Sequence, residues 1–467
     1  MARKREYGAE QPYIGGRLKL RLPFIHYRFE IPEAAQGFIL VAVALSAVAV
    51  HMEALGASRE VAVLMVIING LLYMLHPSFG DPVFPGWITP GIPLVLAWLA
   101  GFEPGPDRIQ AVIALQMLLA VLFLFMGTTG LAKKIVGFVP LSLRCGIILG
   151  AGIAAAFRVI QPGPRSDMYN TPYSVIIGGI VTFLILYSVR YAAAKKNLSV
   201  LMFIGKYGML PGMLVALVVG TLIGELPRPQ IEWGFSPLPF GELIAGYTIF
   251  GIGFPPIGHF ISALPYVVAA YLIAFGDFVV ADTVLKETDA ARQDEKIEFN
   301  ANRCYTICGI RNTILSLIAP YAPLNGPLWT GGTVAVAERY KQGRESMDSI
   351  YGGMGSYVLA MAIAGLLLPI VSLLGPVLPV AMSITMLVTA WACGYAAINM
   401  CKTREEQGIA FIMAIALAFQ GARIGLAVGI VLFLVIGAPK APPAAPAAVA
   451  APAPAPAIAA ADEKKES

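Results

Sequence analysis

The chain has 467 residues, of which 57% are hydrophobic and 13% are charged, and its formal net charge is +5. A soluble domain typically carries about 25% charged residues, so this composition excludes an ordinary soluble globular protein. The basic residues are divided among short polar stretches rather than gathered in one patch, so the charge does not indicate nucleic-acid binding.

The apolar residues come in blocks close to the length needed to cross about 30 Å of hydrocarbon. No water satisfies backbone polar groups there, so each block must be helical. We therefore predict an all-α integral membrane protein. About fourteen spans are expected: 33–52, 60–76, 86–101, 110–130, 136–157, 173–190, 208–224, 263–285, 302–319, 326–338, 350–374, 376–397, 406–422 and 424–438.

Two of these spans, 86–101 and 326–338, are unusually short, and each follows a Pro/Gly-rich extended segment. They are the third span of the first seven and the third span of the second seven. A matched pair of interrupted segments is typical of transporters built from inverted repeats, in which the pair forms the binding site near the middle of the bilayer.

The distribution of Lys and Arg predicts the topology. With the N-terminus inside, 25 of the 33 fall in inside pieces, five fall outside, and Arg144, Arg311 and Arg423 lie within or at the edge of spans. Cytoplasmic loops carry an excess of Lys and Arg. Both termini are therefore expected in the cytoplasm, and because no targeting segment is evident we expect a prokaryotic inner membrane.

Three regions outside the spans have their own character. Residues 1–32 read as a cytoplasmic N-terminal segment, and the Ala/Pro-rich tail 439–467 reads as a disordered cytoplasmic extension. Residues 243–260 form a Gly/Pro-broken apolar stretch, which we interpret as an interfacial helix, with a partial membrane span as the alternative.

Four segments carry a family resemblance: Gly130–Pro140, Gly276–Glu287, Phe299–Arg303 and Trp329–Tyr340. The first resembles the start of the fifth span in nucleobase and sulfate permeases. The others resemble the eighth span, the start of the ninth and the tenth span of nucleobase permeases. The chain thus resembles the nucleobase/ascorbate permease and sulfate permease superfamily over most of its architecture.

The resemblance implies a fold like that of the uracil permease, with seven plus seven inverted spans and a solute bound between the half-helices and the eighth span. It also implies a homodimer through the gate domains. The implied core domain is 33–130 and 263–374, and the implied gate domain is 131–262 and 375–438.

The sequence departs from the nucleobase pattern at the site. The substrate-binding glutamate of the eighth span falls at Ile273, and the glutamate of the tenth falls at Trp329. A nucleobase needs fixed partners for its ring edge, so the loss of both carboxylates favours a small organic or inorganic anion. A nucleobase permease is the alternative, and an anion channel or a non-transporting membrane protein on this fold is the second alternative.

Candidate substrate-binding residues lie where the two half-helices begin. Helix N-termini carry unpaired N–H groups and a partial positive charge, which suit an anion. Alternatively, the Gly and Pro residues at these two helix starts only permit neighbouring helices to cross closely. Trp87 and Trp329 either stack on a flat solute or pack against neighbouring side chains. The candidates are Thr89, Pro90 and Gly91 in the first half, and Asn325, Gly326, Trp329 and Thr330 in the second.

Asp277 lies in an otherwise apolar span, and an intramembrane carboxylate is by default a functional candidate. We predict that it binds substrate and couples transport to a proton or a sodium ion, with a structural carboxylate as the alternative. Arg144 could pair with Asp277 or with an anionic solute, or extend toward the inner face. Arg311 and Asn312 have the same standing.

No enzyme chemistry is evident. The chain has no phosphate-binding loop and no nucleophile elbow. Its four histidines have no carboxylate at metal-ligand spacing, His76 is expected to be a local cap, and the five cysteines are expected to pack within helices. Neither a metal nor a cofactor is therefore predicted. We predict a secondary transporter that moves a small solute across a lipid bilayer by alternating access.

Overall fold

The computed structural model describes residues 5–16, 18–131, 134, 139–162, 167–195, 197–205 and 207–436. At several positions inside helices, Asp277 among them, it describes the backbone alone. The predicted disordered tail 439–467 lies outside the described residues.

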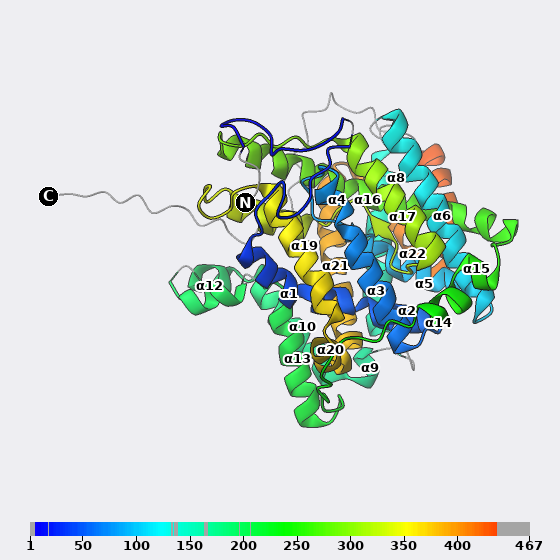
Figure 1. The fold of residues 1–467 in the computed structure, drawn as a ribbon. Coiled ribbons are helices and arrows are strands. Elements are labelled where there is room, and N and C mark those ends of the chain that lie inside the picture. Colours follow the sequence, from blue (N-terminus) through cyan, green and yellow to red (C-terminus); the bar gives the residue numbers. More distant parts are fainter. Residues whose placement is uncertain are drawn as a thin grey trace.

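The regular secondary structure in the described part of the chain is helical apart from two short strands and a few isolated bridges (Figure 1). The first half contains α1 (Ile31–Leu45), α2 (Ala47–Leu55), α3 (Arg59–Tyr73), α4 (Leu75–Ser78), β1 (Gly86–Trp87), η1 (Thr89–Gly91), α5 (Ile92–Leu99), α6 (Pro106–Thr129), α8 (Leu141–Ile160), α9 (Asp167–Asn170), α10 (Pro172–Tyr187), α11 (Val189–Ala194), α12 (Ser199–Gly205) and α13 (Leu210–Ile223). The second half contains α14 (Phe240–Tyr247), α15 (Ile249–Ile252), α16 (Ile257–Ala291), α17 (Ala301–Ile318), β2 (Asn325–Gly326), α18 (Thr330–Tyr340), α19 (Ile350–Leu366), α20 (Leu368–Leu374), η2 (Gly375–Val377), α21 (Leu378–Met400) and α22 (Arg404–Ile436).

Every predicted span overlaps one of these helices, and the all-α membrane fold with two short half-helices after extended segments is confirmed. Within the described residues, seven segments are long and apolar enough to cross a membrane, and four shorter apolar helices accompany them. The number fourteen itself stays a prediction. The last two predicted spans are the arms of α22, which turns back at Gly421, where φ is 82° and ψ is 171°. The arms pack closely, since a Cβ on Gly425 would collide with Leu417.

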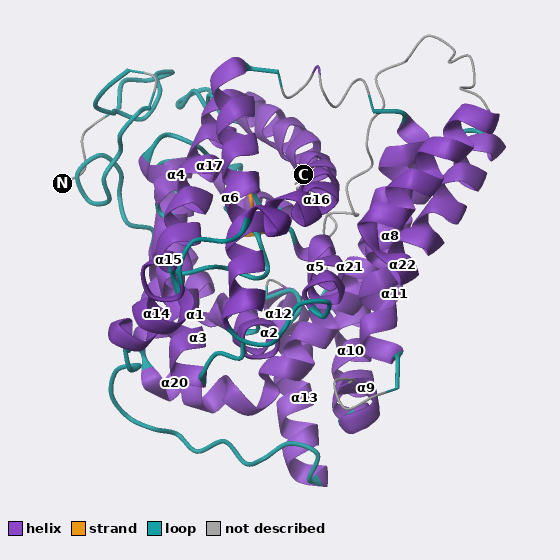
Figure 2. Cartoon of the chain, turned by 90° about the vertical axis from the view of Figure 1, so that its right-hand side faces the viewer, coloured by secondary structure: helices purple, strands orange, loops and turns teal. Residues whose placement is uncertain are grey.

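The helices pack in two groups (Figure 2). In one group α1 packs on α19, α6 packs on α17 and α16, and α3 packs on α19. In the other, α8 packs on α21 and α22, and α10 packs on α13. Figure 2 shows α8 and α22 on one side of the molecule and α3, α6 and α17 on the other. The half-helix α5 touches both groups through α6 and α8.

The N-terminal segment is docked onto the first group rather than extended into solvent. It crosses the top of the molecule in Figure 1. The Arg5 Nη2 donates to Asp294 Oδ2 over 2.9 Å, and the Arg21 guanidinium lies 3.9 Å from the centre of the Tyr351 ring. Both arginines are buried. The Arg292 guanidinium, helped by Arg5, lowers the pKa of Asp294 to about 2, so this carboxylate stays charged near neutral pH.

The stretch predicted as an interfacial helix forms α14 and α15, two short helices that contact α3 and α6. Phe250 and Phe254 are exposed on it. Its apolar side chains are thus available to a surrounding hydrocarbon phase, which agrees with either form of the interpretation. Whether it enters the membrane stays a prediction.

Candidate functional site

Two segments from the two halves of the chain cross at the centre of the first helix group. Strands β1 and β2 pair antiparallel, with Gly86 opposite Gly326 and Trp87 opposite Asn325. The pairing extends on both sides, because Ile88 N donates to Leu324 O over 3.0 Å and Trp329 N donates to Phe84 O over 2.6 Å. The crossing therefore fixes the position of one half-helix against the other.

Each half-helix begins a short distance along the chain after its strand. Helix η1 opens at Thr89 and continues into α5, and α18 opens at Thr330. Pro90 sits in the first turn of η1, where a missing N–H does no harm. Of the predicted binding residues, Thr89, Pro90, Trp329 and Thr330 are half-buried, while Gly91, Asn325 and Gly326 are buried. The structure brings these residues together around one crossing.

Arg311, on α17, holds the crossing together. Its side chain is fully buried. Nη2 donates to the carbonyl oxygens of Gly86, at 3.1 Å, and of Gly326, at 2.5 Å, so one guanidinium binds a residue of each strand. Sequence reasoning left this arginine undecided, and the structure gives it a positioning role.

The charge of Arg311 is balanced through a buried histidine. Arg311 Nη1 lies 3.0 Å from His76 Nε2, and His76 Nδ1 lies 2.8 Å from Asp81 Oδ2. The guanidinium can only donate, so His76 must be neutral with its proton on Nδ1, donating to Asp81. The interpretation of His76 as a local cap is wrong, because its ring reaches across to α17 instead.

The donor atoms of His76, Asp81 and Cys304 lie within 4.8 Å of one another. This geometry alone would suit a soft divalent metal. However, both ring nitrogens of His76 already have partners, and one partner is the cationic guanidinium of Arg311. A metal cation would face that positive charge at close range, so these residues fit an arginine–histidine–carboxylate network better than a metal site.

A second buried network supports β2 from behind. Asn312 Nδ2 donates to Asn325 O over 3.0 Å, and Gln116 Nε2 donates to Asn312 Oδ1 over 3.3 Å. Gln116 Oε1 in turn accepts from Tyr321 N over 2.9 Å. The amide of Asn325 itself has no partner among the described residues. Its backbone is thus held while its side chain keeps its hydrogen-bonding capacity.

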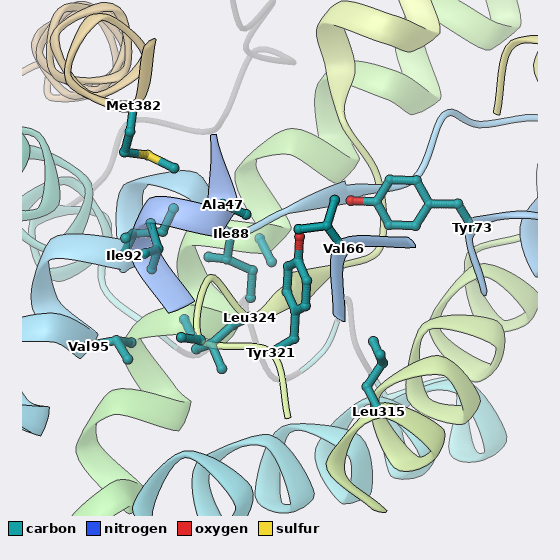
Figure 3. Packing of buried hydrophobic residues seen from close by; sticks show 14 of the residues in the cluster. Ala47, Val66, Tyr73, Ile88, Ile92, Val95, Leu315, Tyr321, Leu324 and Met382 are labelled. Atoms are coloured by element: carbon teal, nitrogen blue, oxygen red, sulfur yellow. The ribbon is translucent and has the colours of Figure 1, made fainter. Parts of the chain in front are cut away.

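Aromatic and aliphatic side chains enclose the crossing (Figure 3). Ile88, Ile92, Leu324 and Tyr321 pack around it, and the hydroxyl groups of Tyr73 and Tyr321 approach the same space beside Val66. The ring of Trp329 meets Phe84 edge-on at 5.5 Å. Trp329 therefore packs against Phe84 as well as standing at the start of α18.

Two predicted residues are not placed at this site. Asp277 belongs to α16, which packs on α18 and contacts η1, but its side chain lies outside the described residues. Arg144 is half-buried in the first turn of α8, and its Nε has no partner among the described residues. No bond in the described part of the chain joins Arg144 to either half-helix.

Solved structures with this arrangement of helices exist. The transmembrane domain of a cyanobacterium bicarbonate transporter, BicA, matches with a TM-score of 0.52 at 15% identity, over 86% of this chain and 97% of that one. SLC26A9 matches with a TM-score of 0.53 at 15% identity, over 87% of this chain and 65% of that one. The murine SLC26A9 anion transporter in its inward-facing state matches with a TM-score of 0.51 at 13% identity, over 87% and 68%.

No protein-family model matches the chain, and no curated protein sequence matches it. The likeness therefore rests on the fold, and at these identities it establishes the fold alone. BicA and SLC26A9 are members of the SLC26 and sulfate permease family, so the fold that the sequence resemblance implies is confirmed. The chain has the uracil-permease-like fold shared by the transmembrane domains of the SLC26 and sulfate permease family.

Proposed function

We propose that this chain is a secondary transporter that binds a small organic or inorganic anion between the two half-helix ends. The observation that carries the proposal is the crossing itself. Two helix N-termini, Thr89 and Thr330, open beside paired strands that a single buried arginine holds. Oriented N–H groups at such ends favour negative charge. The similar folds of a bicarbonate transporter and an anion transporter support the same substrate class.

We further propose that transport proceeds by alternating access, with the first helix group as the core domain and the second as the gate domain. The contacts support this division, because the helices within each group pack more closely than those across the boundary. The solute would travel with the core domain while the gate domain stays fixed. The implied homodimer through the gate domains remains part of this proposal.

The substrate class is tested by ligand-induced stabilisation of the purified, detergent-solubilised protein. The panel contains bicarbonate, sulfate, dicarboxylates, aromatic carboxylates and nucleobases, each at two pH values. A ligand that binds only the folded state stabilises it by RT ln(1 + [L]/Kd), which is about 2.7 kcal/mol at a hundredfold excess over Kd. We expect stabilisation by one anion class, followed by saturable uptake of that anion into proteoliposomes. Stabilisation by nucleobases alone would reverse the assignment, and non-saturating flux would indicate a channel.

Coupling is tested at Asp277. We propose that this carboxylate binds the coupling proton or sodium ion, because it lies on the helix that packs on α18. The Asp277→Asn variant removes the titrating group at nearly constant size. We expect its uptake to lose dependence on pH, or on sodium, and to fall by at least tenfold under a gradient. If uptake by this variant depended on pH and on sodium as uptake by the wild type does, Asp277 would be removed from the mechanism.

A further inference from the structure

A cavity of about 760 Å³ lies where the two helix groups meet. One wall comes from α2, α3 and α5, through Glu53, Arg59 and Leu96. The other comes from α8 and α21, through Arg158 and Met382. The cavity lies at the end of the molecule away from the N-terminal segment. Arg59, which lines the cavity, is the first residue of α3, whereas the N-terminal segment binds Ser78, beyond the last residue of α3.

Arginines dominate the charged lining. Arg59, Arg158 and Arg228 face two carboxylates, Glu53 and Glu232. Arg59 Nη2 donates to Val371 O over 3.0 Å, and the other donors of its guanidinium have no hydrogen bond to a described residue. Arg228 is exposed, and no hydrogen bond joins it to another described residue. The cavity therefore has an excess of positive charge.

The Arg158 guanidinium donates to Glu53 across the boundary between the groups. The exposed fraction of each of these two side chains is 25%. An anion that enters the cavity therefore competes with the Glu53 carboxylate for the same donors, since guanidinium binds carboxylate and other oxyanions in the same bidentate geometry.

Apolar side chains of α2 and α21, among them Val48, Met382 and Met386, also line the cavity. Met382 belongs to the same buried cluster as Ala47 and Ile92 (Figure 3). Helix α21 also contacts η1, the start of the first half-helix. None of the described residues that line the cavity belongs to η1 or α18, so the cavity lies beside the half-helix ends and does not include them.

We propose that this cavity is an anion-capture site, in which Arg59, Arg158 and Arg228 hold an oxyanion before it reaches the half-helix ends. The proposal rests on the proposed anion transport and adds a second site on its path. Because three arginines face two carboxylates, the cavity carries a net positive charge, and such a charge raises the local concentration of anions. Glu53 sets the affinity of the site by competing for Arg158, which keeps the captured anion exchangeable.

Two substitutions with opposite expected signs test the proposal. Arg228→Gln removes a cation that has no hydrogen bond to another described residue, and Glu53→Gln removes the competitor of Arg158. The matched control is Arg190→Gln, an exposed residue on α11 that does not line the cavity. Each variant is assayed for uptake of radiolabelled bicarbonate and sulfate into proteoliposomes, and for stabilisation by the same two anions in detergent, at low and high ionic strength.

We expect Arg228→Gln to raise KM and the apparent Kd by about three- to tenfold, and Glu53→Gln to lower both by about threefold. The kcat stays within about twofold, and both shifts shrink at high salt, where exposed charges are screened. Values equal to those of Arg190→Gln in both variants, or shifts in the same direction, overturn the capture site. A wild-type protein that neither binds nor transports any anion of the panel above refutes anion transport instead, so the two failures are distinguishable.

Discussion

Arg311→Gln is expected to abolish anion uptake and to destabilise the folded protein by about 3–5 kcal/mol, the usual cost of breaking a buried charged network. The substitution leaves the carbonyl oxygens of Gly86 and Gly326 and the Nε2 of His76 without the donor that they share. It also removes the cation that balances the buried Asp81 carboxylate through His76. Uptake into proteoliposomes and thermal unfolding in detergent measure the two effects.

Arg311→Lys separates charge from geometry. An ammonium group keeps the positive charge but cannot present a planar fork to two carbonyl groups and a histidine. We expect the lysine variant to recover part of the stability and little of the uptake. Arg190→Gln serves as the control for loss of a surface cation and should leave both measurements unchanged. Full uptake in Arg311→Lys would show that only the positive charge matters and that the hydrogen bonds of the guanidinium to Gly86, Gly326 and His76 are dispensable.

The half-helices could be predicted from the sequence because their signals are local. Proline and glycine around Gly86 and Gly326 forbid a continuous helix, and the apolar residues after each break are too few to cross a bilayer. The position of both breaks, third in each set of seven, then pointed to an inverted repeat. The structure adds the register of the strands, which depends on contacts between residues 240 positions apart.

The network of Arg311, His76 and Asp81 could not be assembled from the sequence, because its members are up to 235 positions apart and share no spacing rule. A signal was nevertheless present. All three are polar residues in or next to apolar spans, and a charged group at that depth requires a partner. Taken together, Arg311, His76 and Asp81 predict that these side chains pair with one another, although the sequence does not indicate which atoms meet.

The docked N-terminal segment was missed for a similar reason. Its composition is polar, which is typical of a solvated extension, yet Arg5 and Arg21 are buried. Their partners, Asp294 and Tyr351, lie in loops and helix starts of the second half of the chain. Polar composition shows that a segment is outside the bilayer, but it does not show whether charged partners elsewhere will bind it.

Gly86→Ala is expected to destabilise the folded protein by about 1–3 kcal/mol, the range for overpacking a tight site, and to remove most of the uptake. A Cβ at this position would lie 2.6 Å from the Trp329 Cβ and 2.9 Å from the Trp329 nitrogen. Backbone cannot give way as a flexible side chain can, so the two strands must separate and the end of α18 must move away from η1. Thermal unfolding and proteoliposome uptake are the measurements.

Gly326→Ala, directly across the strand pair, is the matched control. Its Cβ would meet only the Ile88 Cγ1, at 3.1 Å, and then the Trp87 carbonyl carbon at 3.6 Å, and a side-chain carbon can shift by the few tenths of an ångström required. The same added methyl group on the same crossing should therefore cost less stability and leave most of the uptake. Equal effects of the two substitutions would mean that uptake does not depend on the spacing of the half-helices. Loss in Gly86→Ala alone would tie transport to the distance between the two helix ends, because the two variants differ in little but the atoms that the new methyl group displaces.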